Sequence, residues 1–124
     1  MTKKGPITII LIFQFPQDTV TPQLLHFLLD HSHVLEDLSV EAGAAFVNES
    51  FLYDVLRHNQ LRQLQRLRLA VSPSIGLTAR LARRVIEEVT SLRQLSLSKW
   101  NVQARELRAL NDYVKKNNYD LTLV

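Results

Sequence analysis

A repeated spacing of leucines constrains the fold of this chain more than any other feature of its sequence. The six-residue pattern L-x-x-L-x-L is complete at 64–69 and 92–97, ends in valine at 35–40, and is kept with isoleucine at 7–12. A fifth, degenerate unit follows at 118–123, after a slightly shorter interval than the others. Self-similarity at a fixed period of about 20–50 residues indicates a repeat architecture in which each unit packs against its neighbours. We expect strands near 7–12, 35–40, 64–69, 92–97 and 119–123.

Segments with helical periodicity lie between these predicted strands. Leu81, Val85 and Val89 recur four residues apart, and charged residues occupy most positions between them. Asn48 and Thr78 are residue types that cap helix N-termini. Similar apolar stripes predict helices over about 22–31 and 103–116, a shorter helix from Asn48 that carries Phe51 to Leu56, and a helix from Thr78 through Val89. Because each connection contains a helix, successive strands should be parallel, with right-handed crossovers.

Polar residues fill the x positions of the second, third and fourth predicted strands. They are Glu36, Asp37 and Ser39; Gln65, Arg66 and Arg68; and Arg93, Gln94 and Ser96. In a three-layer α/β sheet both faces are buried, so its strands read as continuous apolar runs. The alternation here predicts one solvent-exposed sheet face, with the helices on the other. A small three-layer α/β enzyme stays an alternative, which requires these polar faces to be buried.

The segment 91–97 and the helix start Gly76-Leu77-Thr78 are similar to a known family. They resemble the ribonuclease-inhibitor-like class of leucine-rich repeats, and the resemblance covers about 7–124. It implies an α/β fold: a right-handed leucine-rich-repeat solenoid, a horseshoe fragment with about five parallel strands on the concave side and four helices on the convex side. The family usually places Asn or Cys five residues after the central leucine, to hydrogen-bond the turn backbone. Those places hold Phe15, Gly43, Ser72 and Trp100 here.

The same resemblance carries an expectation about function. The class includes the substrate-binding halves of F-box proteins and the sensor regions of nucleotide-binding immune receptors. It implies a non-catalytic protein-interaction module that binds a protein partner through its concave strand face. Such a module would suit the substrate-recognition part of an F-box-type ubiquitin-ligase receptor.

Composition sets further limits. The chain has 124 residues, enough for one domain at 7–124 behind a polar lead at 1–6, and its 46% hydrophobic content excludes a disordered chain. The absence of cysteine excludes disulfides and thiolate metal sites. No apolar run reaches the roughly 18 residues of a membrane span. Gln14 and Pro16 interrupt the one run that resembles a secretion signal. We therefore expect a cytoplasmic or nuclear protein without membrane contact.

The two halves of the chain differ in charge. Residues 1–62 hold four Lys or Arg against seven Asp or Glu, a net charge of −3, whereas residues 63–124 hold eleven against five, a net charge of +6. A basic half could serve nucleic-acid binding, which we keep as an alternative function. The interleaved acids favour an ordinary solvated surface instead.

No residue pattern points to a reaction. His26, His31, His33 and His58 lack the spacing of a metal-ligand pair, and the three glycines form no phosphate-binding loop. Serine, histidine and aspartate occur in no motif that would bring them together. The sequence therefore predicts no catalytic residue, no metal and no cofactor.

The predicted alignment of strands places equivalent residues in rows across the concave face. One row is Ile9, Asp37, Arg66, Gln94 and Asp120, and the next is Leu11, Ser39, Arg68, Ser96 and Thr122. Asp37 should neutralise Arg66, which leaves positive charge at Arg68, Arg93 and Lys99. The predicted partner-binding residues are Arg68, Arg93, Ser96, Lys99, Trp100 and Tyr119. For Trp100 a second interpretation is that it replaces the absent asparagine and packs inside.

The first predicted strand departs from this alternation. Its expected concave positions, Thr8, Ile9, Leu11 and Phe13, are mostly apolar, and an apolar open edge invites pairing. Solenoids normally end in a polar capping repeat. We therefore expect that the chain is a fragment of a longer array with further repeats, or that this end is covered by a partner or by a second copy of the chain through self-association.

Overall fold

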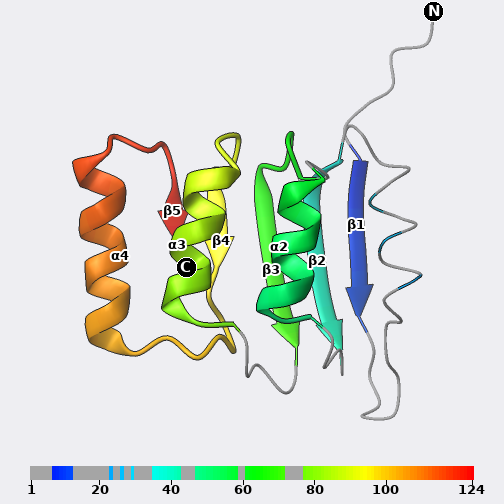
Figure 1. Cartoon of the computed structure of the whole chain (residues 1–124), viewed down its shortest axis with the longest axis horizontal. Helices are drawn as coiled ribbons and strands as arrows, with labels where there is room; N and C mark the ends of the chain where they lie inside the picture. The colour runs from blue at the N-terminus through cyan, green and yellow to red at the C-terminus, as the bar shows by residue number, and fades with distance from the viewer. Residues whose placement is uncertain are drawn as a thin grey trace, which may run out of the picture.

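The computed structural model describes residues 7–12, 23, 26, 29, 35–42, 47–58, 61–71 and 77–124. Five parallel strands form a single sheet in the order β1-β2-β3-β4-β5, which is also their order in the chain (Figure 1). The strands are β1 (Ile7–Ile12), β2 (Leu35–Ala42), β3 (Arg66–Val71), β4 (Gln94–Ser96) and β5 (Thr122–Leu123).

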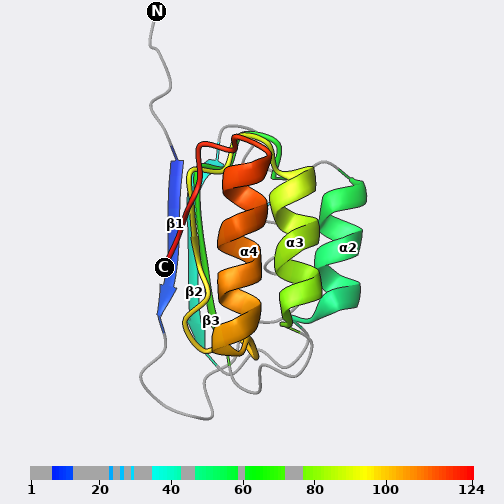
Figure 2. The same ribbon diagram turned by 90° about the vertical axis from the view of Figure 1, so that its left-hand side faces the viewer.

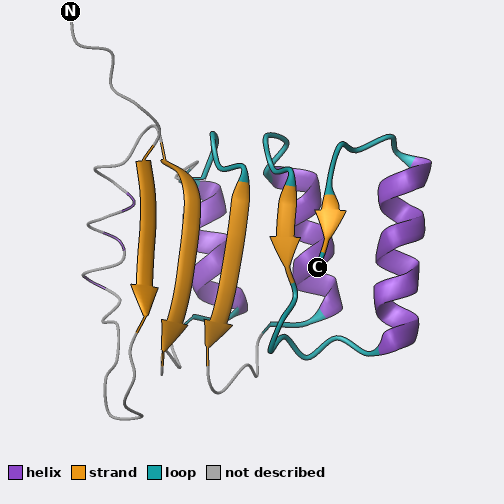
Figure 3. Ribbon diagram, turned by 180° about the vertical axis from the view of Figure 1, so that it is seen from behind, coloured by secondary structure: helices purple, strands orange, loops and turns teal. Residues whose placement is uncertain are grey.

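Three described helices lie on one side of this sheet. They are α2 (Glu49–Arg57), α3 (Ala79–Glu88) and α4 (Ala104–Lys116), and Figure 2 shows them as a layer beside the strands. Seen from behind, the strands stand in front of α2 and α3, while α4 lies to the side beyond β5 (Figure 3). The expected α/β class with parallel strands is therefore confirmed. Of the helix expected near 22–31, the structure describes Gln23, His26 and Leu29, which have helical backbone.

Local sequence signals explain where the helices begin. Asn48 caps α2, and its side-chain oxygen accepts a hydrogen bond of 3.1 Å from the backbone N–H of Phe51. Gln103 and Glu106 form a capping box at α4, where the Gln103 N–H donates to the Glu106 carboxylate at 3.0 Å. Thr78 occupies the cap position of α3, as expected, but its side chain makes no capping hydrogen bond.

The apolar positions of the repeat form the core between the sheet and the helices. All nine such residues of the second, third and fourth units are at most 9% exposed: Leu35, Leu38, Val40, Leu64, Leu67, Leu69, Leu92, Leu95 and Leu97. Leu52 and Val55 of α2, Leu81 and Val85 of α3, and Leu110 of α4 meet them from the helix side. Burial of such a side chain stabilises the fold by about 1.5–3 kcal/mol. The leucine pattern is thus the inner face of the sheet.

The pairing of the central strands has the predicted alignment. Asp37 pairs with Arg66 and Arg66 with Gln94, while Ser39 pairs with Arg68. Arg68 in turn pairs with Ser96. The strand bounds shift toward the C-terminus in β3, which covers Arg66–Val71 rather than 64–69.

The two outer strands depart from the predicted rows. A register shift between Ile7 and Thr8 pairs Ile10, rather than Leu11, with Ser39. At the other edge Thr122, rather than Asp120, pairs with Gln94. The expected shortening of the last repeat is therefore wrong. Gln94 follows its partner Arg66, and Thr122 follows its partner Gln94, by the same number of residues. Other expectations rest on residues that lie outside the described ranges: Phe13, Phe15, His31, His33, Gly43 and Ser72.

Candidate functional site

The sheet surface opposite the helices is the candidate site, and we call the part formed by β2, β3 and β4 the open face. Side chains alternate along a strand, so the residues between the buried leucines point away from the helices. Arg66 and Arg93 are 62% and 67% exposed, and Arg68 is 37% exposed. Gln94 is also exposed. These side chains contribute little to the core, and none of the described helices covers them (Figure 3).

Ion pairs join β2 and β3 across the open face. Arg66 lies 3.5 Å from the Asp37 carboxylate, which is the predicted neutralising pair. Arg68 lies 3.2 Å from Glu41 and donates to the Ser39 hydroxyl at 3.4 Å. The expectation that Arg68 keeps an unpaired charge is therefore wrong. Glu41 lies outside the six-residue unit, because β2 continues two residues past that unit, so the repeat pattern alone does not predict this contact.

Arg93 also has a carboxylate partner, contrary to the prediction. Its guanidinium lies 3.6 Å from the carboxylate of Asp120. The backbone N–H of Thr122 donates to the Arg93 carbonyl at 2.9 Å, so Asp120, two residues before Thr122, lies near the Arg93 side chain. Both side chains are largely exposed, so the pair adds little stability and Arg93 is accessible to a partner.

Lys99 and Ser96 complete the polar residues predicted for this surface. Lys99 is exposed, makes no ion pair with a described residue, and has a φ of 66° in the left-handed region. Ser96 is half-buried and its hydroxyl accepts a long hydrogen bond of 3.4 Å from the Ser98 N–H. Of the three cations expected to be unpaired, only Lys99 has no carboxylate partner in the described part of the chain.

Trp100 belongs to the core rather than to the binding surface. Its side chain packs against the buried cluster, is 7% exposed, and donates its indole N–H to the backbone oxygen of Leu69 at 3.1 Å. This bond ties the segment after β4 to β3, the preceding strand. Of the two interpretations, the packed one holds. Trp100 is therefore not a residue of the binding surface.

Tyr119 likewise lies on the helix side of the sheet. It is half-buried, packs against the core, and its ring centroid is 5.9 Å from that of Tyr113 on α4. The register of β5 again accounts for the error, since Tyr119 falls three residues before the strand. It is not a residue of the open face.

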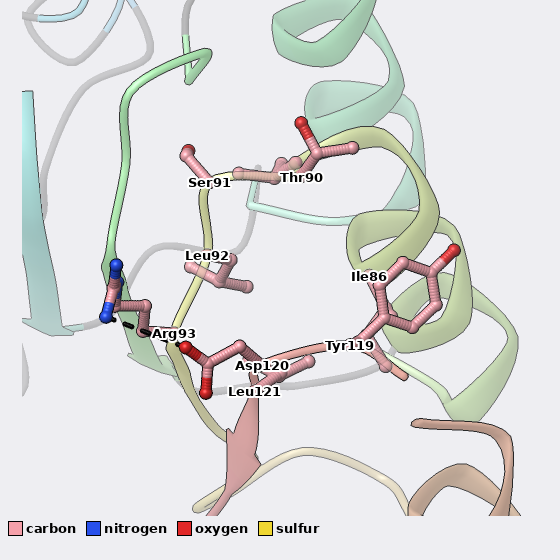
Figure 4. Close-up of a pocket in the computed structure, with 9 residues that line it drawn as sticks. Ile86, Thr90, Ser91, Leu92, Arg93, Tyr119, Asp120 and Leu121 are labelled. Atoms are coloured by element: carbon pink, nitrogen blue, oxygen red, sulfur yellow. Dashed lines mark ion pairs between the residues drawn. The ribbon is translucent and has the colours of Figure 1, made fainter. Parts of the chain in front are cut away.

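Arg93 and Tyr119 instead line one small pocket at the start of β4 and β5 (Figure 4). Its volume is about 150 Å³, and the Arg93–Asp120 ion pair lies at its edge. Leu92 and the hydroxyl side chain of Ser91 form part of its wall, although the Ser91 hydroxyl already donates to the Leu64 carbonyl at 2.7 Å. A cavity of this size admits a benzene-sized molecule and is too small for a nucleotide or a peptide.

Two of the histidines gather around one carboxylate. His26 and His58 lie 3.7 Å and 3.5 Å from Asp54, and the His58 Nδ1 also lies 2.8 Å from the Asp54 backbone oxygen. Arg57 contacts the same carboxylate at 3.0 Å. Within the described ranges no group of three or more His, Asp or Glu residues is arranged to hold a metal ion.

Comparisons with protein-family models, with curated proteins and with solved structures found no match to this chain. Among the described helices, none combines the length and the apolar character needed to cross a membrane.

Proposed function

We propose that this chain is a non-catalytic protein-interaction module that binds its partner through the open face. The observation that carries the proposal is the alignment of polar side chains across three adjacent strands, on a face that none of the described helices covers. A three-layer enzyme would bury both faces of such a sheet. The exposure of Arg66, Arg93 and Gln94 argues against that alternative.

We further infer that the fold is a leucine-rich-repeat solenoid of the ribonuclease-inhibitor-like class. Three features support this inference: a nearly constant chain separation between paired strand residues, a strand order equal to the chain order, and α2, α3 and α4 on one face. The role as the recognition part of an F-box-type ubiquitin-ligase receptor stays a prediction from the resemblance. An F-box encoded in the same transcript would support it.

The charges of the open face favour a protein partner over nucleic acid. Arg66, Arg68 and Arg93 each have a carboxylate within 3.6 Å. A phosphate backbone on this face would meet those carboxylates as well as the arginines, and would lose much of the attraction that drives nucleic-acid binding. A protein surface with charges of both signs can instead extend the existing pairs.

Site-specific photo-crosslinking in cells tests the proposal. A photoreactive side chain at Gln94 samples the open face, and one at Arg57, which is 77% exposed on α2, samples the helix side. We expect a discrete protein adduct from position 94 that is absent from position 57. Arg66→Glu should weaken the adduct, whereas Arg57→Glu should leave it unchanged.

Two results would contradict the proposal. Identical adducts from positions 94 and 57 would show that the crosslinks are not specific to the open face. The absence of any adduct at position 94, with the protein folded by circular dichroism, would show that the face has no partner in those cells.

A further inference from the structure

The small pocket at the start of β4 and β5 lies where a regular contact between neighbouring repeats is interrupted. One repeat earlier, the Ser91 hydroxyl donates to the backbone oxygen of Leu64 at 2.7 Å and so joins two successive repeats. Paired residues of β3, β4 and β5 follow one another at a constant interval. By that interval Leu92 corresponds to Leu64, and Tyr119 corresponds to Ser91. The position that should donate to the Leu92 carbonyl therefore holds a tyrosine instead of a serine.

The Leu92 carbonyl faces the side of the pocket. A trans peptide directs its C=O and its N–H to opposite sides. The Arg93 N–H, which shares a peptide with the Leu92 carbonyl, donates to the Gln65 oxygen at 2.8 Å on the β3 side, so the carbonyl faces β5. Leu92 is 5% exposed, yet no described residue donates a hydrogen bond to its carbonyl. Buried carbonyl groups are ordinarily paired, so this end of the pocket offers an unsatisfied acceptor.

The remaining walls of the pocket suit an aromatic ring. Ile86 and Val89 are buried, and Leu121 is half-buried. The Tyr119 ring forms the side opposite Leu92 (Figure 4) and lies 5.9 Å, between centroids, from the ring of Tyr113. The volume of about 150 Å³ matches a single benzene ring.

The charges at the pocket cancel. Arg93 and Asp120 are the charged residues of its lining, and they lie 3.6 Å apart at its edge. A charged ligand would give up hydration among apolar walls without an unpaired counter-charge to replace it. An uncharged ring with one hydrogen-bond donor satisfies both the apolar walls and the acceptor. A phenol has this composition, because its hydroxyl keeps its proton up to about pH 10.

We propose that this pocket binds the phenol side chain of a tyrosine carried by the partner of the open face. The ring lies between Leu92 and Tyr119, and its hydroxyl donates to the Leu92 carbonyl as the Ser91 hydroxyl donates to that of Leu64. Arg93 belongs both to the open face and to the pocket, so a partner on that face reaches the pocket. Tyrosines in fitted pockets often dominate the binding energy of an interface. The assignment of the tyrosine to this partner rests on the proposed function.

The other aromatic side chains fit this pocket less well. Phenylalanine fills the volume but leaves the Leu92 carbonyl without a donor. Tryptophan carries a donor, but its two fused rings exceed a cavity that admits one ring. The second ring nitrogen of a neutral histidine would lie against apolar walls without a partner.

Binding of p-cresol, the isolated side chain of tyrosine, tests the pocket on the purified protein. NMR titrations that follow the backbone amides should locate p-cresol at Ser91, Arg93 and Asp120, with a dissociation constant on the order of 1 mM. Toluene has the same shape without the hydroxyl, and a purely apolar cavity would prefer it. We expect p-cresol to bind about threefold to tenfold more tightly, because only p-cresol supplies a donor.

A matched pair of variants identifies the acceptor. Tyr119→Ser and Tyr119→Ala both remove one wall, but only the serine supplies a hydroxyl at the position that corresponds to Ser91. The preference for p-cresol over toluene should disappear in Tyr119→Ser and persist in Tyr119→Ala. Asp120→Asn should also keep the preference, since the phenol donates to the Leu92 carbonyl and not to the carboxylate. Circular dichroism checks the fold of each variant.

Crosslinking in a lysate tests whether the tyrosine belongs to the partner. Addition of p-cresol at about ten times its dissociation constant should weaken the adduct from position 94 about fivefold. Thr90→Phe, which places a ring at the pocket, should weaken the adduct similarly, because Thr90 is exposed and lines the pocket. Gln63→Phe is the control: Gln63 is also exposed, lies in the turn before Leu64 and does not line the pocket.

Four outcomes would overturn the proposal. Equal binding of toluene and p-cresol, or no binding of either, would remove the phenol. Loss of the preference in Asp120→Asn would assign the donor to the carboxylate. An adduct at position 94 that withstands both p-cresol and Thr90→Phe would show that the partner does not enter the pocket. Absence of any adduct would overturn the proposed function and the partner's tyrosine with it, while the p-cresol titration, which needs no partner, would still decide what the pocket binds.

Discussion

Replacement of Leu95 by alanine should lower the free energy of unfolding by about 3–4 kcal/mol. Leu95 lies in β4 and is fully buried, and its backbone pairs with Leu67 of β3 and Leu123 of β5. The substitution removes three carbons, which at about 0.8 kcal/mol for each buried CH₂ amounts to about 2.4 kcal/mol of lost transfer energy. The strands on both sides and α3 above restrict collapse of the site, so a cavity adds to this loss.

Urea unfolding measures this effect with two signals. Circular dichroism follows the helices, and fluorescence follows Trp100, the single tryptophan of the chain, which is buried and becomes exposed on unfolding. Coincident transitions justify a two-state free energy. Gln94→Ala is the control, because Gln94 is the exposed neighbour of Leu95 and its side chain bonds no described residue. It should change stability by no more than about 0.5 kcal/mol. Equal losses from the two variants would refute a sheet with one buried face.

Three further predictions concern individual side chains. Trp100→Phe should cost about 1–3 kcal/mol, because it leaves the buried Leu69 carbonyl without the indole donor; thermal unfolding measures the loss, and an unchanged midpoint would contradict it. Burial, together with the hydrogen bond to Glu87, raises the pKa of the Tyr113 phenol above 10.0. The stability that this raised pKa contributes is complete below about pH 10 and is lost as the pH rises through the pKa of the folded state. Tyr113→Phe should therefore reduce the loss of stability above about pH 10, measured by urea unfolding at alkaline pH. Lys99→Gly should raise the free energy of unfolding by about 1 kcal/mol, since glycine adopts the left-handed conformation at position 99 without steric cost; a destabilised variant would show that the lysine side chain contributes more than its strain costs.

The sequence predicted the central strands well because one physical requirement determined them. A leucine displaced by one residue would point to solvent, so the buried pattern fixes the alignment of β2, β3 and β4. Asp37 beside Arg66 follows directly from that alignment. The same requirement is weak at β5, where Leu121 and Leu123 are only partly buried, so the leucine pattern allows two alignments of β5 with β4. The predicted alignment, with Asp120 opposite Gln94, was the wrong one, and it misplaced both Asp120 and Tyr119.

The repeat pattern could not predict which arginines of the open face have carboxylate partners, for a different reason. Arg68 contacts Glu41, a residue that belongs to no repeated position, and Arg93 contacts a residue whose place depends on β5. Trp100 shows a third limit: its place in the repeat suggested an asparagine substitute, but a large aromatic ring also suits a binding surface. Only the packing around Leu69 distinguishes the two.

The constant separation between paired residues affects how such a sheet forms. Asp37 pairs with Arg66, Arg66 with Gln94, and Gln94 with Thr122, so each pairing closes a loop of nearly the same length. Loop-closure entropy depends on that length, at about 0.6 kcal/mol for each doubling, so no single step of assembly carries an exceptional entropic cost. Folding can begin at any pair and extend to its neighbours. The two-residue β5 is the shortest of the described strands, so opening should start there, and amide hydrogen exchange should slow progressively from β5 toward β3.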